Sequence, residues 1–181
     1  LLGLPLPLTA VQILWMNLVE DGLPNFALAF EGADSQIMKR KPLSRTEPIL
    51  DKKGRALAFA FSVITDLVLL TIFFAFYKFS TLSLDYIRTF IFAALGTDSL
   101  IYVFSLKSLD RPIFRTNILD NRYLLTAVAF GFLLMALAVY LPALNPVLKT
   151  APLAAHHLAA IFVLGILKIS LMELIKWFYN R

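Results

Sequence analysis

The chain has 181 residues, of which 59% are hydrophobic and 16% are charged, and its formal net charge is +5. A soluble domain is nearer about 45–50% apolar and about 25% charged, so this composition excludes an ordinary soluble protein and predicts an integral membrane protein. The absence of cysteine from the sequence excludes disulfides, thiolate metal sites and cysteine nucleophiles. The basic residues lie between apolar runs and not in one patch, which argues against nucleic acid as a partner.

The first apolar run covers residues 9–30, after a short loop at residues 1–8 that contains two prolines. A helix that spans a bilayer needs about 20 residues, so this run is long enough to cross. Its middle nevertheless carries Asn17, Glu20 and Asp21, which fall within an arc of roughly 100° on a helix. A charged side chain at the bilayer centre costs about 2.5–3.5 kcal/mol on insertion scales. Two neighbouring carboxylates therefore need a compensating partner, and a bound cation is the natural one.

Gly22 and Pro24 follow the acidic pair and predict a break in this helix. Pro24 has no N–H group, so it cannot donate a hydrogen bond to the carbonyl of Glu20 in a regular α-helix. That carbonyl is then free to bind a ligand. Broken helices at membrane depth are tolerated where they line a cavity or are covered by protein. The sequence therefore predicts a cation site at the break, with the side chains of Asn17, Glu20 and Asp21 as ligands.

Four further apolar runs predict an all-α transmembrane bundle of about five spanning helices. The spans are expected at about 9–30, 56–77, 86–107, 123–141 and 157–177. The two basic segments between spans, residues 31–55 and 108–122, are predicted to be cytoplasmic by the positive-inside rule. These segments, their edges and the C-terminal tail hold thirteen of the 17 Lys and Arg residues, whereas the predicted outer loops hold three. The C-terminus is therefore expected in the cytoplasm.

Several other charged residues are predicted at or near membrane depth. Asp98 lies about 15 Å along its helix from the outer edge, where either an ion-binding role or a bond to a neighbouring helix accounts for it. For Asp66, in the second span, we favour a structural hydrogen bond or ion pair over an ion or proton role. Lys168 is the candidate partner of Asp66, or a built-in counter-charge. Glu173 and Lys176 are interpreted as side chains that snorkel to the cytoplasmic interface.

The run Asn-Leu-Val-Glu-Asp-Gly-Leu-Pro resembles the sixth transmembrane helix of P-type cation ATPases of the calcium-pump-like branch. That family typically has Asn-Leu-Val-Thr-Asp-Gly-Leu-Pro there, so Glu20 replaces a threonine. The resemblance extends to residues 167–177, which are similar to the tenth helix of the family. Asp98 aligns with a ligand glutamate of the eighth helix. By resemblance, the cation ligands are Asn17, Asp21 and Asp98, with Glu20 as an additional carboxylate.

The resemblance implies that residues 1–181 are helices six to ten of a longer pump, and the start at Leu1 without Met or a basic signal region agrees with that. The transported cation is expected to be Ca²⁺, which takes oxygen ligands. ATP and Mg²⁺ are expected to act only through domains outside this chain. The sequence lacks an Asp-Lys-Thr-Gly motif and a Gly-rich phosphate loop, so the chain alone is predicted to be inactive. The implied partners are the lipid bilayer, upstream membrane helices and a cytosolic phosphorylation domain, and the implied location is the cell membrane.

A different class of protein is also compatible with the residues alone. A stand-alone proton-coupled carrier half would use buried carboxylates as a proton relay, and a non-catalytic membrane scaffold would use them for packing. The relay would consist of Glu20, Asp21, Asp66 and Asp98. Upstream sequence in the same gene separates these alternatives, since only the pump requires a phosphorylation motif there.

Overall fold

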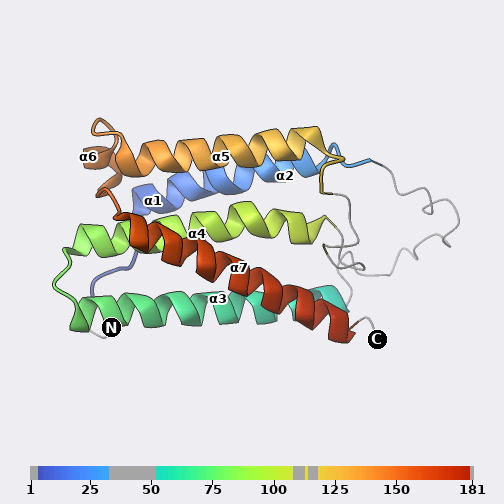
Figure 1. Cartoon of the computed structure of the whole chain (residues 1–181), viewed down its shortest axis with the longest axis horizontal. Helices are drawn as coiled ribbons and strands as arrows, with labels where there is room; N and C mark the ends of the chain where they lie inside the picture. Colours follow the sequence, from blue (N-terminus) through green and yellow to red (C-terminus); the bar gives the residue numbers. More distant parts are fainter. Residues whose placement is uncertain (1–3, 33–51, 108–112, 114–117, 180–181) are drawn as a thin grey trace, which may run out of the picture.

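The computed structural model describes residues 4–32, 52–107, 113 and 118–179 (Figure 1). Its helical elements in chain order are α1 (Ala10–Trp15), η1 (Met16–Asp21), α2 (Gly22–Leu28), α3 (Lys52–Phe79), α4 (Leu84–Leu106), α5 (Arg122–Tyr140), α6 (Asn145–Leu148) and α7 (Ala155–Tyr179). These described ranges contain no strand, so the predicted all-α fold is confirmed. Most of the two basic segments predicted to be cytoplasmic lies outside the described residues.

Among the described residues, four helices are long and apolar enough to cross a membrane, over Ser62–Phe79, Leu84–Leu106, Arg122–Tyr140 and Ala155–Trp177. They overlie the second to fifth predicted spans, and α3 extends further toward the N-terminus than the apolar run indicates. The first predicted span consists of α1, η1 and α2, three short helical segments placed end to end. The chain is thus an integral membrane protein, and its first predicted span differs in construction from the four helices found long enough to cross.

Polar side chains define where several helices begin. Thr9 accepts a hydrogen bond from the backbone N–H of Gln12, and the Gln12 amide oxygen accepts one from the backbone N–H of Thr9 at 2.9 Å, a reciprocal arrangement that caps α1. The hydroxyl of Ser83 accepts from the backbone N–H of Tyr86 at the start of α4. The side chain of Asn121 caps α5 in the same manner. These caps satisfy N–H groups that a helix leaves unpaired in its first turn.

Helix α4 is the centre of the bundle. It packs against α3, α5, α7 and η1, and 67% of its apolar stretch is buried, against 33% or less for the other three long helices. In Figure 1, α7 crosses α4 obliquely, while α5 runs beside α2. The largest cluster of buried side chains joins Phe73 of α3, Phe90 and Phe92 of α4, and Met135 of α5. Groups that project from α4 are therefore held between several helices.

Two glycines allow the helices around α4 to approach closely. A Cβ atom at Gly131 of α5 would lie 2.5 Å from the Leu100 side chain of α4. A Cβ atom at Gly165 of α7 would lie 3.4 Å from Ile101 and 3.6 Å from the carboxylate of Asp98. Lipid is as apolar as leucine, so membrane helices associate through close packing and interhelical polar bonds more than through hydrophobic burial. Gly165 brings α7 within reach of a charged residue on α4.

Candidate functional site

The first predicted span changes its helical geometry at the residues predicted as ligands. Met16–Asp21 form a π-helix between two α-helices, with i→i+5 hydrogen bonding, a feature that is frequent at functional sites. The predicted break at Gly22 and Pro24 is not found, because Gly22 has right-handed helical angles (φ −62°, ψ −57°) and begins α2. Pro24 then falls in the first turn of α2, where a missing N–H is tolerated. The distortion is a wider turn directly before the proline and not an interruption.

Glu20 is the buried residue of the predicted ligand set. Its side chain is 1% exposed, and neither carboxylate oxygen has a hydrogen-bond partner among the described residues. The carboxylate lies over Gly96 of α4 and beside the methyl end of Met135 of α5, and a Cβ atom at position 96 would collide with both. Gly96 therefore provides the space that Glu20 occupies. A buried carboxylate without a donor is costly unless another charge compensates it.

The two other predicted ligands of this segment lie closer to the surface of the described bundle. Asn17 is exposed and Asp21 is half-buried, although both belong to the same π-helix as Glu20. The segment thus presents one deep carboxylate, one shallower carboxylate and one amide, all of which carry oxygen atoms. These are the atoms that a hard cation binds.

Asp98 is bonded to a neighbouring helix, which is one of the two alternatives that the sequence left open for it. Its carboxylate forms an ion pair and hydrogen bond with the ammonium group of Lys168 on α7, and both residues are 7% exposed. The candidate pairing of Lys168 with Asp66 is therefore replaced by a pairing with Asp98. The physical reason is the close approach of α7 to α4 at Gly165, one turn before Lys168.

The four predicted ligands do not converge on one point in the described structure. Gly96 and Asp98 are two residues apart on α4, so their side-chain directions differ by about 200°. Glu20 packs on the Gly96 side, whereas Asp98 faces α7. Accordingly, the described part of the chain contains no group of three or more His, Asp or Glu side chains placed to hold one metal ion.

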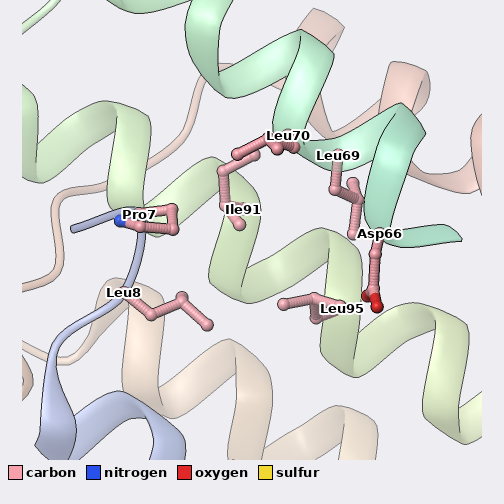
Figure 2. A pocket seen from close by; sticks show the side chains of 7 residues that line it. All are labelled: Pro7, Leu8, Asp66, Leu69, Leu70, Ile91 and Leu95. Carbon is pink, nitrogen blue, oxygen red and sulfur yellow. The ribbon is translucent and has the colours of Figure 1, made fainter. Parts of the chain in front are cut away.

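Asp66 lies apart from these residues, at a cavity of about 220 Å³. Figure 2 shows its carboxylate at one end of the cavity, near Leu95 of α4. The other lining residues are apolar: Pro7, Leu8, Leu69, Leu70 and Ile91. No hydrogen bond or ion pair joins Asp66 to another described residue, so the structural bond favoured for it is not found in this part of the chain.

Comparison with known families decides what these helices are. Residues 5–178 match the family described as "Cation transporting ATPase, C-terminus". The chain belongs to this family. A calcium-transporting ATPase of Bacillus subtilis is 37% identical over 150 residues, which are 83% of this chain and 17% of that protein. Calcium-transporting ATPase 1 of Bacillus cereus is 28% identical over 97% of this chain and 21% of its own length. Calcium-transporting ATPase type 2C member 2 of Rattus norvegicus is 30% identical over 96% of this chain and 18% of its own length.

The chain thus spans about a fifth of the length of the curated relatives that it matches. As a member of the cation-transporting ATPase family, it contributes a C-terminal membrane region. Membership of the family agrees with the resemblance found in the first membrane segment and favours a pump over a stand-alone carrier or scaffold.

The C-terminal end of this chain also contains a polar cluster that the sequence interpretation missed. Glu173 and Lys176 were expected at the interface, and that expectation is wrong, because both are buried and bonded within the bundle. Glu173 accepts hydrogen bonds from the Ser105 hydroxyl at 2.5 Å and from the backbone N–H of Ile113 at 2.8 Å. Lys176 donates to Glu173 at 2.9 Å and to the Ser105 carbonyl at 2.6 Å. The sequence offered one signal for this cluster, the spacing of three residues that lets Glu173 and Lys176 pair on one helix face. It offered no signal for their partner on α4.

The contact between Gly96 and Glu20 leads to a testable expectation for this ATPase region. We expect Gly96→Ala to displace the Glu20 carboxylate and to lower the apparent cation affinity about 10–100-fold, the range found when groups that orient metal ligands are removed. The flexible ends of Glu20 and Met135 can move, so the protein should still fold. The measurement is the cation concentration that gives half-maximal ATP hydrolysis by the complete polypeptide. Gly32→Ala is the matched control, because a Cβ atom there would meet nothing within 4 Å. An unchanged half-maximal cation concentration in Gly96→Ala would show that the contact between Gly96 and Glu20 does not position Glu20 for cation binding.

Proposed function

We propose that this chain is the ion-binding and translocating membrane portion of an ATP-driven calcium pump. The observation that carries the proposal is the buried, unpartnered carboxylate of Glu20 on a π-helix that also carries Asp21 and Asn17. Three relatives from different organisms are calcium-transporting ATPases by name. An ionisable side chain at membrane depth is typical of an ion pathway, and Ca²⁺ is the cation that these names favour.

In this proposal, Glu20, Asp21 and Asn17 supply part of the oxygen shell of the ion. Ca²⁺ takes six to eight oxygen ligands, so three side chains are not a complete shell. Asn17 is exposed and Asp21 half-exposed in the described bundle, which leaves that face accessible to membrane helices from an upstream part of the polypeptide. The π-helix adds backbone carbonyls as further candidate ligands, because the change from one hydrogen-bonding register to another leaves a carbonyl without its usual donor.

The energy for transport would come from outside this chain. In the proposed pump, ATP with Mg²⁺ phosphorylates a cytosolic domain of the same polypeptide, and strain transmitted to the membrane helices opens the ion site to alternate sides. We propose the cell membrane as the location of the pump, and the positive-inside rule puts the C-terminus and the two basic segments in the cytoplasm. The role of this chain is to bind, enclose and release the ion.

The test is ATP hydrolysis by the complete polypeptide in membrane vesicles, with Ca²⁺, Mn²⁺, Na⁺ and K⁺ compared at constant Mg²⁺ and with Mg²⁺ also varied alone. We expect Ca²⁺ to stimulate ATP hydrolysis. Asp21→Asn should lower the apparent Ca²⁺ affinity by more than about 100-fold, since removing a direct ligand should cost at least as much affinity as removing a residue that orients a ligand. Asp85→Asn is the matched control, because Asp85 is an exposed aspartate at the start of α4. The proposal would be contradicted if the rate of ATP hydrolysis depended on none of these cations and were the same in Asp21→Asn as in the wild type.

A further inference from the structure

The ion pair between Lys168 and Asp98 places a positively charged side chain on a different face of α4 from Glu20. Both groups are 7% exposed, and they join α7 to α4 in the most buried part of the bundle. Gly96, which contacts Glu20, and Asp98, which contacts Lys168, are separated along α4 by only about 3 Å of helical rise. The unpartnered Glu20 carboxylate and the paired Asp98 carboxylate therefore lie at nearly the same depth, on different faces of one helix.

The lysine provides Asp98 with the positive charge that a bound metal ion would otherwise supply. An ammonium group is a compact charge with three N–H donors, so it neutralises a carboxylate and bonds to its oxygens. Because the ammonium is covalently attached to α7, it cannot diffuse away when the surrounding ion concentration falls. A mobile cation at Asp98 would either lie beside the ammonium that holds Oδ2 and be repelled by it, or displace it and leave it buried without a partner, and both are unfavourable.

Within this chain, the formal charges of the side chains around the candidate site fit one divalent ion; ligands from upstream membrane helices are not counted. Glu20, Asp21 and Asp98 contribute three negative charges when ionised, and Lys168 contributes one positive charge, while Asn17 is neutral. The balance is −2, which one Ca²⁺ neutralises. Without Lys168 the balance would be −3, which is more than one divalent ion can compensate. Asp66 is not included, because it lies at a separate cavity between α3, α4 and the N-terminal loop.

We propose that Lys168 is a tethered cation that permanently occupies Asp98, so that the protein binds one divalent ion per cycle, at the segment with Glu20 and Asp21. This inference rests on the proposed function, since it specifies how many ions the same membrane region carries. It assigns Lys168 a role in stoichiometry: the side chain excludes a second mobile ion. Asp98 then stabilises the lysine and is not a ligand of the transported ion.

The test is equilibrium binding of radioactive ⁴⁵Ca²⁺ to the purified complete polypeptide in detergent, expressed per phosphorylatable polypeptide. We expect one ion per polypeptide for the wild type, with a Hill coefficient of one. Lys168→Gln frees the Asp98 carboxylate and should raise the ratio toward two, with the second ion weaker. Lys168→Gln/Asp98→Asn should return the ratio to one, and Lys78→Gln, at an exposed lysine at the end of α3, should also give one.

The outcomes separate this inference from the proposed function. A wild-type ratio of two, or a ratio that stays at one in folded Lys168→Gln, would overturn the tethered-cation role. If Lys168→Gln does not fold, the double variant still decides, because loss of its single ion would show that Asp98 is a ligand and would overturn the inference. If the ion pair had only a structural role, Lys168→Gln would lower the stability of the protein without changing the number of Ca²⁺ ions bound per polypeptide. Absence of saturable binding by the wild type would instead overturn the proposed function.

Discussion

Replacing Glu20 by glutamine is expected to preserve the stability of the cation-free protein and to remove its stabilisation by Ca²⁺. Glu20 is buried with both oxygens unpartnered, so burial of its carboxyl group opposes folding in the absence of an ion. The isosteric amide keeps the side-chain shape and cannot ionise, so the free energy of unfolding of the cation-free state should not fall. In the wild type, Ca²⁺ at 100 times its dissociation constant should add about 2.7 kcal/mol of stability. Glu20→Gln should lose most of that increment.

The measurement is thermal unfolding of the complete polypeptide in detergent, with and without Ca²⁺, for the wild type and Glu20→Gln. Asp85→Asn is the control for the loss of one carboxylate, because Asp85 is exposed and pairs with Arg88 three residues along α4. It should leave both melting temperatures near those of the wild type. A Glu20→Gln protein that is less stable without Ca²⁺ and still responds fully to Ca²⁺ would contradict the assignment of Glu20 as a buried ligand.

Removal of the Lys176 charge is expected to lower the free energy of unfolding by about 3–5 kcal/mol, the cost of leaving one member of a buried ion pair without its partner. Lys176 is fully buried and donates to the Glu173 carboxylate, and it also donates to both oxygen atoms of Ser105. Lys176→Met keeps most of the side-chain volume but leaves Glu173 charged between α4 and α7. The expected result is a lower melting temperature and weaker attachment of α7.

A paired variant distinguishes a broken ion pair from poor packing. Glu173→Gln/Lys176→Met removes both charges and should recover much of the lost stability, because no buried charge is then left unpaired. Lys78→Met, at the exposed end of α3, should have little effect. Should Lys176→Met and Lys78→Met melt at the same temperature, the buried cluster would not contribute to stability as argued.

The helical fold could be predicted from the sequence because a membrane segment needs a long apolar run, and such runs are visible without tertiary information. The position of the polar segment at Asn17, Glu20 and Asp21 was also visible, since charges are rare in these runs. The π-helix could not be predicted, because the periodicity of an α-helix assumes 3.6 residues per turn and does not describe a wider turn. Pro24 indicated a distortion, and the structure places that distortion one turn earlier than the expected break.

The partners of the buried charges could not be predicted, because the sequence gives the depth of a residue in a membrane but not the direction in which it faces. Lys168 could reach either Asp66 or Asp98 by depth alone, and the close packing at Gly165 directs it to Asp98. The same limit applies to Glu173, which was expected to reach toward water and instead bonds to Ser105 on another helix. Interhelical contacts depend on the rotation of each helix, which local patterns leave open.

The central claim is that the π-helical segment of this chain binds the transported cation. The most direct test is equilibrium binding of ⁴⁵Ca²⁺, without ATP, to the complete polypeptide carrying both Glu20→Gln and Asp21→Asn. We predict that the wild type binds Ca²⁺ saturably and that the double variant, folded as judged by its melting transition, shows no saturable binding over the same concentration range. Wild-type binding that persists with unchanged affinity in the folded double variant would contradict the claim and would place the ion elsewhere in the protein.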